Sequence, residues 1–489
     1  MKASEILTLK NYNEQLTLLK KNQSDFNTGN IDDSISFYEG KHAILQDEVL
    51  QDEWITEEVM NSEGKIEKKS FCVKKTKLAL PYPQQIVSNC TSFLYGNDID
   101  LVLNSGREED NKQKAFNQFV HIWNNDLRMI GLLKSATIHA CIETRSAIQF
   151  FESDGKVKAK VLCRKKGYDI YRHKDENEKL DAVIVEYKRD KIDRGRLRSN
   201  VSTTDIWMAD GLLRYEGSRF ISEESKKAPI KKILIAYLEQ DYPEYHCVRP
   251  IIETQDYCRS NHSQVNKNIG NPALVVYGSL TKKPLYSTTT RIYEVQAPDG
   301  FDPSKNTSGR MEYLELSTAP ESVKLEMQNN ETDIYRFTWP DLNRLMTEAK
   351  NGNMSTQSMK LTFLQSFVKL AEKRITHDEF VSRCINIIKE LAAVVYDNNN
   401  IKDLDISFKY NSILPDSVSD MINMLAVAVG AGITSRENAV RILTINGPET
   451  LEEIYKEKLE EAIVANAKAA SANVNLDGVE NNRNEEGIN

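Results

Sequence analysis

Residues 355–396 read STQSMKLTFLQSFVKLAEKRITHDEFVSRCINIIKELAAVVY, and apolar side chains recur through them at steps of three and four residues. This period is typical of a helix that buries one stripe. No proline or glycine interrupts it, and Ser355 or Thr356 can serve as N-cap after the turn-forming Asn351-Gly-Asn353. At 1.5 Å per residue the helix would be about 60 Å long. The apolar positions are Leu364, Phe367, Val368, Ala371, Ile375, Phe380, Val381, Cys384, Ile385, Ile388, Leu391, Ala392 and Val395.

The composition bounds the class of protein. The chain has 489 residues, of which 40% are hydrophobic, enough for roughly three domain-sized units. Its formal net charge of −8 argues against a protein that binds nucleic acid over its whole surface, because such binding needs many Lys and Arg side chains on phosphates. The same charge is compatible with a protein past which DNA must slide without adhering.

The sequence contains neither a predicted membrane span nor a recognisable signal peptide. No run approaches the ~18 apolar residues that a spanning helix needs, and the first residues lack an apolar core with a cleavage site. The seven cysteines are scattered and include no C-x-x-C pair. We therefore expect free thiols in a reducing cytoplasm.

The first half of the chain predicts helices followed by antiparallel strands. Gly40 follows a short helix as its C′ residue, and Pro83 lies in the first turn of another helix. Residues 188–198 are strongly charged, which favours a solvated hairpin tip. The expected elements are a helix within 1–35, a hairpin or irregular insertion at 46–78, helices at 81–96 and in 110–138, and strands at 157–161, 182–187, 202–214 and 233–238.

In the second half, two predicted helices bracket a β-rich stretch. The second of these helices ends at Trp339-Pro340, because the residue before a proline is disfavoured in the α region. The tail from 469 is small and polar, and we expect it to be disordered. The expected elements are helices at 245–268 and 321–335, strands at 273–277, 291–295 and 311–316 between them, a strand at 405–410, and helices at 417–430, 434–444 and 449–468.

No catalytic motif is present. The sequence lacks the phosphate-binding, dinucleotide-binding, nucleophile-elbow and zinc-protease patterns, so no catalytic residue, cofactor or metal is predicted. The pairs Glu108-Glu109 and Glu452-Glu453 are expected on solvated faces. His246, Cys247, Cys258 and His262 are zinc-binding types, but on one continuous helix Cys247 and Cys258 would lie about 16 Å apart, too far for one tetrahedral site.

The link from Asp341 to Met354 admits two interpretations. It joins two predicted helices, carries Arg344, Glu348 and Lys350, and ends in Asn351-Gly-Asn353. The simpler interpretation, which the sequence alone favours, is an ordinary interhelical loop. The functional one is a mobile loop that projects toward a ligand.

Several segments, taken in order, resemble the portal proteins of tailed bacteriophages. FYEGKHAI at 37–44 is similar to the family's Tyr-x-Gly-x-His segment, and QIVSNCTSFLYG at 85–96 to its helix that ends in an aromatic-x-x-Gly pattern. Gln255 stands where an aromatic residue is usual, and Ser355-Thr356 where Ser-Gly is expected. The other matching segments are IIETQD at 251–256 with Ser260, ALVVYG at 273–278, IYRFTWPDL at 334–342, LPD at 414–416 and GITSRE at 432–437.

The resemblance implies an α+β, mainly helical portal fold. Its parts would be an N-terminal wing of helices and antiparallel strands at 1–240, a first stem helix at 241–270, a β-rich clip at 271–318, and a second stem helix at 319–340. A tunnel loop at 341–354, a long spine helix with the return to the wing at 355–410, a helical crown at 411–468 and a disordered tail at 469–489 would follow.

The same resemblance implies a function without enzymatic activity. The chain would form a ring, usually of twelve subunits, at one capsid vertex of a virion, and double-stranded DNA would be packaged and ejected through it. Terminase large subunit, head-completion adaptor, major capsid and scaffolding proteins would be its partners, with no membrane, and assembly would take place in the host cytoplasm. In the tunnel loop, Arg344, Lys350, Asn351 and Asn353 would lie nearest the DNA.

Two alternatives remain at this stage. One is a different structural protein of the phage, a head-tail connector or a baseplate component. The other is a nucleic-acid-processing enzyme, which a metal-dependent cleavage assay would distinguish from a channel.

Overall fold

A computed structural model of the chain describes residues 1–21, 28–46, 50–60, 66–104, 110–193, 196–225, 230–270, 320–340 and 363–411, short paired strands between 274 and 313, and the single residues 427 and 430. The chain divides into two compact units, one of Met1–Met354 with Met359–Ile413 and one of Ser355–Ser358 with Leu414–Asn489. Nearly all described residues belong to the first unit. The predicted tunnel loop, crown helices and tail lie outside the described residues.

The longest described helix is α11, Leu364–Val395, with 32 residues and a length of about 48 Å. Its buried side includes Phe380, Val381, Cys384 and Ile388, and it packs on strands β4, β5 and β11 of the first unit. The prediction of one long helix is thus confirmed, and its predicted start at Ser355 or Thr356 lies outside the described residues. The N-cap of α11 is the buried Phe363, and no side chain caps the helix.

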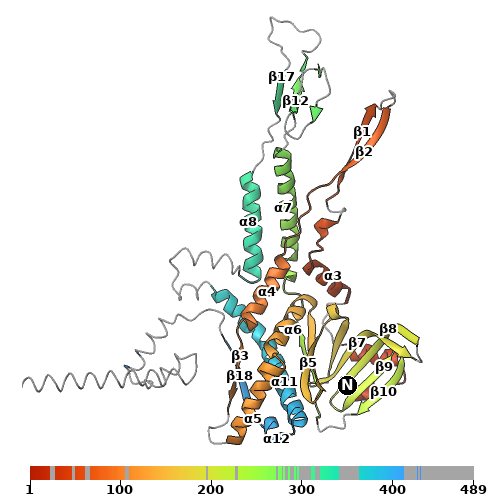
Figure 1. Cartoon of the computed structure of the whole chain (residues 1–489), viewed down its shortest axis with the longest axis vertical. Helices are drawn as coiled ribbons and strands as arrows, with labels where there is room; N and C mark the ends of the chain where they lie inside the picture. Colours follow the sequence, from red (N-terminus) through yellow and green to blue (C-terminus); the bar gives the residue numbers. More distant parts are fainter. Residues whose placement is uncertain are drawn as a thin grey trace, which may run out of the picture. The chain divides into compact units, whose positions relative to one another are not determined.

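Among the shorter helices, α4 and α12 contact α11 (Figure 1). Gly40, at φ +85°, follows α3 in the left-handed region, as the sequence predicted. The predicted pair of helices in 110–138 is α5 and α6, separated by a π-helical turn at Ile122–Asp126. The helices are α1 Ala3–Ile6, α2 Tyr12–Leu19, α3 Thr28–Tyr38, α4 Tyr82–Tyr95, α5 Asp110–His121, α6 Met129–Glu143 and α12 Asn399–Lys402.

Two antiparallel sheets follow α6, as the alternating pattern predicted. One has the order β11-β4-β5 and the other β10-β9-β8-β7-β6. Apolar residues of both sheets, among them Ala147, Leu162, Val183 and Ile235, form a common core. The strands are β4 Arg145–Ser153, β5 Lys156–Leu162, β6 Tyr168–Lys174, β7 Leu180–Asp193, β8 Arg196–Met208, β9 Gly211–Glu216, β10 Arg219–Ser225 and β11 Ile235–Glu239.

The charged stretch 188–198 is the end of the β7–β8 hairpin, as predicted. Its described residues are paired strands, where the prediction had a solvated loop. Arg189 and Lys191 bind Glu216 of β9 at 2.7 and 2.9 Å, so cross-strand ion pairs accommodate the charge within the sheet.

Two more strand pairs complete the N-terminal part. The stretch predicted as a hairpin or irregular insertion is a hairpin of β1 Glu53–Met60 and β2 Ile66–Val73. The predicted strand near 405–410 is β18 Ile406–Tyr410, and it pairs with β3 Ile99–Leu103. The sequence had not predicted β3, which is stabilised by a partner about 300 residues away in the chain.

Helices α7 Arg249–Gly270 and α8 Pro320–Phe337 pack against each other and bracket the predicted strands (Figure 1). The described strands between them form three antiparallel pairs, β12–β17, β13–β16 and β14–β15. Their bounds are β12 Leu274–Tyr277, β13 Ser279–Leu280, β14 Leu285–Tyr286, β15 Arg291–Ile292, β16 Val295–Gln296 and β17 Arg310–Tyr313. Among the helices of the described residues, none combines the length and apolar character needed to cross a membrane.

Candidate functional site: the anchored ends of residues 341–362

The predicted DNA-contacting residues Arg344, Lys350, Asn351 and Asn353 lie outside the described residues. The structure describes instead the two points where the chain leaves α8 and returns to α11. Pro340 is the last described residue before this segment and Phe363 is the first after it.

The departure point is held by Trp339, which is fully buried. Its Nε1–H donates to Glu244 Oε1 at 2.7 Å, and its ring stacks on Phe93 of α4 with centroids 5.4 Å apart. The Pro340 carbonyl accepts a hydrogen bond from Asn89 Nδ2 at 2.9 Å, and Lys369 Nζ donates to the Thr338 carbonyl at 3.2 Å. Backbone and side chain are therefore both fixed where the segment begins.

The return point uses the same aromatic side chain. Phe363 is 5% exposed, and its ring centroid lies 5.9 Å from that of Phe93. Phe93 thus contacts Trp339 and Phe363, so the described residues on either side of 341–362 meet at one side chain. We call the residues that hold these ends the loop anchor: Phe93, Glu244, Trp339, Phe363, Lys369 and Lys373.

A buried carboxylate lies at the centre of the loop anchor. Glu244 comes from the turn between β11 and α7, and it binds the ammonium groups of Lys373 and Lys369, the latter at 3.5 Å. Burial raises the pKa of Glu244, but Lys373, Lys369 and the bond from Trp339 outweigh it and hold this pKa below its ordinary value. Burial lowers the pKa of Lys373, but the Glu244 carboxylate and the neighbouring Cys90 and Cys141 together raise it by more, so Lys373 stays charged. The site joins α8 and α11 through one charge cluster.

Next to Lys373, one turn along α11, His377 extends this cluster. It is buried, and burial together with the Lys373 charge lowers its pKa to about 3. Its Nδ1 lies 2.9 Å from the hydroxyl of Tyr95 on α4, within hydrogen-bond distance. His377 is therefore uncharged at neutral pH.

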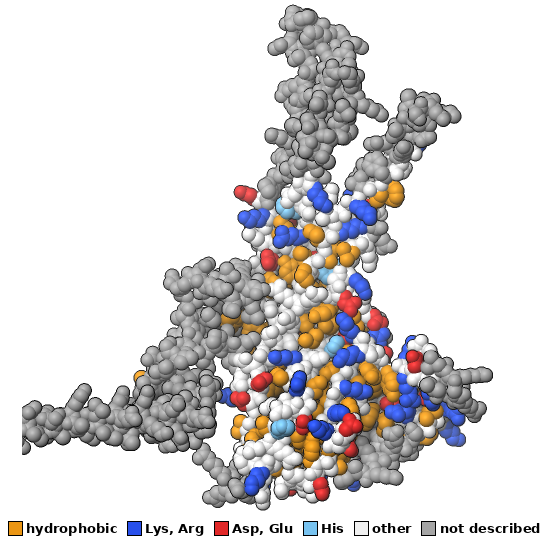
Figure 2. Space-filling model, viewed as in Figure 1, with side chains coloured by type: hydrophobic (Ala, Val, Ile, Leu, Met, Phe, Trp, Pro, Cys, Tyr) orange, Lys and Arg blue, Asp and Glu red, His pale blue; other side chains and the backbone are white. Residues whose placement is uncertain are grey.

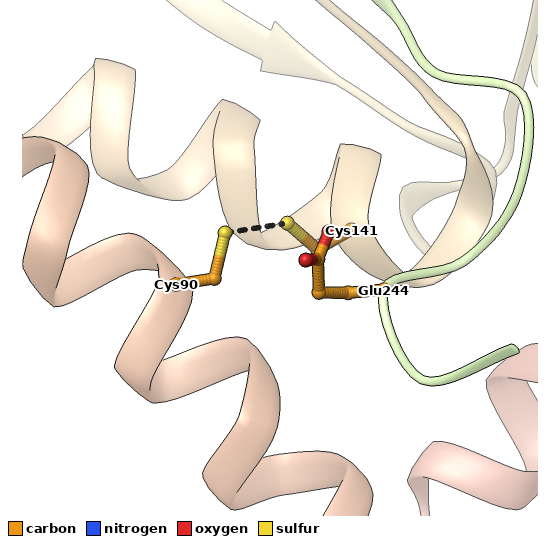
Figure 3. Close-up of side chains that lie close together, drawn as sticks. All are labelled: Cys90, Cys141 and Glu244. Atoms are coloured by element: carbon orange, nitrogen blue, oxygen red, sulfur yellow. Dashed lines mark hydrogen bonds between the residues drawn. The ribbon is translucent and has the colours of Figure 1, made fainter. Parts of the chain in front are cut away.

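Two buried thiols lie beside Glu244 (Figure 3). Cys90 of α4 and Cys141 of α6 have their Sγ atoms 3.8 Å apart in a thiol–thiol hydrogen bond, and burial raises the pKa of Cys90. With Glu244 they place three metal-ligating atoms within 4.8 Å of one another. Because both carboxylate oxygens of Glu244 already accept from Trp339 and Lys373, we interpret the group as the polar centre of the anchor.

A second group of ligand-type residues fixes a turn. Glu143 Oε1 accepts from His139 Nδ1 at 3.0 Å, and Glu143 Oε2 accepts from the Arg164 backbone N–H at 2.7 Å. Burial lowers the pKa of His139, but hydrogen bonds with Cys163 and Glu143 raise it to about 9. The sequence spacing of these three residues gave no sign that they would meet.

The residues considered for zinc from the sequence have separate partners. The Cys247 thiol lies 3.9 Å from the Phe337 carbonyl oxygen, and Cys258 lies 3.5 Å from Glu326 Oε1. His246 stacks on Tyr242, and His262 lies against Asn266 on its own helix. Among the described residues, these four do not form a group with a common centre.

Two of the segments that resemble portal proteins, 37–44 and 251–260, contact each other at helix α7. His42 Nδ1 bonds to Asp256 Oδ2, and the other Asp256 oxygen accepts from the Leu80 backbone N–H at 2.8 Å. Ser260 Oγ accepts from the Leu78 N–H at 2.9 Å. The segment Gly40-Lys41-His42 and helix α7 therefore meet in one buried polar contact.

Gln255, a departure from the family pattern, has a packing role. It is buried between α7 and α8, where its Nε2 donates to the Met327 carbonyl and its Oε1 accepts from Asn330, both at 3.3 Å. An amide at this position joins the two helices by hydrogen bonds instead of aromatic packing.

The sequence profile described as "Phage portal protein, SPP1 Gp6-like" matches residues 19–464. The chain belongs to this family. The match spans most of the chain, which confirms the resemblance drawn from the short segments and removes the alternative of a different connector or baseplate protein. The portal family is a family of structural proteins, so it does not support the enzyme alternative.

Two solved structures are distantly similar to this portal family member. The neck of an empty gene transfer agent particle, computed with C6 symmetry, is 9% identical, with a TM-score of 0.38 over 76% of this chain and 91% of that one. The virion of a native gene transfer agent particle is 9% identical, with a TM-score of 0.35 over 75% and 89%. The comparison with curated proteins found no match.

Proposed function

We propose that this portal family member forms a closed ring, of twelve subunits by analogy with its family, at one vertex of a phage-like capsid. Double-stranded DNA passes through the ring during packaging and ejection. The observation that carries the proposal is the family match across residues 19–464. The net charge of −8 supports it, because a weakly adhesive wall suits the passage of a polyanion.

In this proposal residues 341–354 are a loop that lines the channel. The loop anchor supports this role, since the described residues on either side of the segment, Trp339 and Phe363, are both held at Phe93. Arg344 and Lys350, with Asn351 and Asn353, would lie nearest the phosphates. Each exposed contact would be worth on the order of 1 kcal/mol or less, so the loop guides DNA without holding it.

The β-rich stretch 271–318 would be the clip, on which terminase large subunit and the head-completion adaptor dock. The helices and sheets of residues 1–240 would be the wing, in contact with major capsid and scaffolding proteins. The stem would consist of α7 and α8, and the ring would assemble in the host cytoplasm before it becomes part of the virion.

The test is the assembly state of the full-length chain. Native mass spectrometry and electron microscopy should show closed rings with a central pore, and the pure protein should not hydrolyse ATP. A chain that remains monomeric at concentrations typical of capsid assembly, or ATP hydrolysis that copurifies with it, would overturn the proposal.

A further inference from the structure

Helix α11 is apolar on two opposite sides. One side is buried in the first unit, with Leu370, Phe380, Val381 and Cys384 at 4% exposure or less. On the other side Leu364, Val368 and Ile375 are 56, 58 and 76% exposed, and Ala371 between them is also exposed. We call these four exposed residues the front stripe. Figure 2 shows apolar side chains interspersed among charged ones on the face viewed.

The spacing of the front stripe is that of a helix-packing seam. Steps of four, three and four residues at about 100° per residue place all four side chains within a narrow strip about 16 Å long. Such a 4-3-4 repeat is the pattern by which one helix packs against another. Directly beyond the stripe the exposed positions Asp378, Glu379 and Asn386 are polar, and Val394 near the end of α11 is a separate exposed apolar side chain. A helix that is apolar on opposite sides is stable when both are covered.

A polar hollow lies at the end of the front stripe. Ile375 lines it together with Phe380 and Arg383 of α11, and its volume is about 280 Å³. Arg383 is half-buried, and burial lowers its pKa. Within the part of the chain that the structure describes, no hydrogen bond or ion pair satisfies its guanidinium. The nearby Glu379 carboxylate raises the pKa of Arg383 by less than burial lowers it, so an acceptor oxygen from outside would stabilise the charge further.

We propose that the front stripe and Arg383 form a lateral interface, covered by a second copy of this chain. The neighbour packs apolar side chains along Leu364, Val368, Ala371 and Ile375 and places an acceptor oxygen on the Arg383 guanidinium. This inference rests on the proposed ring. In a closed ring each subunit uses two different faces for its two neighbours, so an apolar seam turned away from the subunit's own core is the expected surface.

The hollow favours a protein partner over DNA. Four carboxylates line it, those of Glu178, Glu239, Asp241 and Glu379, together with the cations Arg172, Lys174 and Arg383. This lining has no excess positive charge to attract a polyanion, whereas a neighbouring subunit can present a single carbonyl or carboxylate oxygen in a fixed position. The adjacent seam is also apolar, which suits a helix and not a phosphate backbone.

The first test compares full-length variants that carry a new charge at different positions of α11. Val368→Glu combined with Ile375→Glu should raise the subunit concentration at half assembly on the order of tenfold or more, because the charges become buried without partners. Arg383→Gln should act in the same direction and more weakly. Asn386→Glu, exposed on the same helix beyond the stripe, is the matched control. Circular dichroism shows whether each variant is folded.

Assembly of the double variant at the wild-type concentration would overturn the inference while leaving the ring proposal intact. A wild-type chain that never forms rings would overturn the ring proposal itself. If the double variant fails to fold, hydroxyl-radical footprinting of the wild type decides. The stripe should be protected in rings and reactive in dissociated subunits. Protection in both states would mean that the chain's own residues cover the stripe. Reactivity in both states would mean that nothing covers it. Either result refutes the proposed interface.

Discussion

The substitution Glu244→Gln tests whether the buried charge cluster holds the ends of residues 341–362. The amide keeps the shape of the side chain and can still accept from Trp339 Nε1, but it leaves Lys369 and Lys373 without their counter-ion. Removing one partner of a buried pair costs about 3–5 kcal/mol. The side chains of Lys369 and Lys373 are 29% and 20% exposed, so part of their hydration returns. We therefore expect a loss of about 2–3 kcal/mol in the free energy of unfolding.

The assay is urea denaturation of the dissociated chain, followed by the fluorescence of Trp339 and the other tryptophans. Glu372→Gln, exposed on the same helix, is the matched control and should change stability by less than about 0.5 kcal/mol. The double variant Glu244→Gln with Lys373→Met should regain part of the loss, because it removes the unpaired ammonium. A Glu244→Gln chain as stable as the control, or a double variant less stable than Glu244→Gln alone, would refute the assigned role of the cluster.

The remaining predictions concern pH, the loop and the β-rich stretch. Since the pKa of His377 falls to about 3 on folding, the unfolded chain binds the extra proton, and stability should fall as pH drops below about 6.5, by at most about 1.4 kcal/mol per unit. His377→Gln should flatten that slope between pH 6.5 and 4.5 in urea titrations; an unchanged slope would contradict the prediction. Arg344→Glu and Lys350→Glu should assemble normally yet lower the DNA packaged or retained, measured by nuclease protection, and normal packaging by both would make the segment a mere connector. Deleting 281–314 should spare the far-ultraviolet spectrum of the helices and abolish packaging, and packaging at the wild-type level would exclude this stretch as the terminase dock.

Local patterns predicted most of the elements because each depends on residues close in sequence. Gly40 ends α3 because a left-handed residue is needed there, and Pro340 excludes a longer α8. The alternation in 182–187 and 202–214 was enough to predict antiparallel strands, since its period does not depend on the partner. The N-cap of α11 shows the limit of such patterns. Phe363 is not a capping residue type, and its ring lies against Phe93 of a helix that is distant in sequence.

By itself the sequence determined most of the described helices and strands, the β-rich stretch between two helices, and the resemblance to phage portal proteins. It did so because periodicity and short motifs are properties of neighbouring residues. Only the tertiary structure decided which distant residues meet: His42 with Asp256, β3 with β18, and Glu244 with Trp339 and Lys373. These contacts join segments about 95 to 300 residues apart, and their energy depends on burial and on a partner's position, neither of which a local pattern encodes.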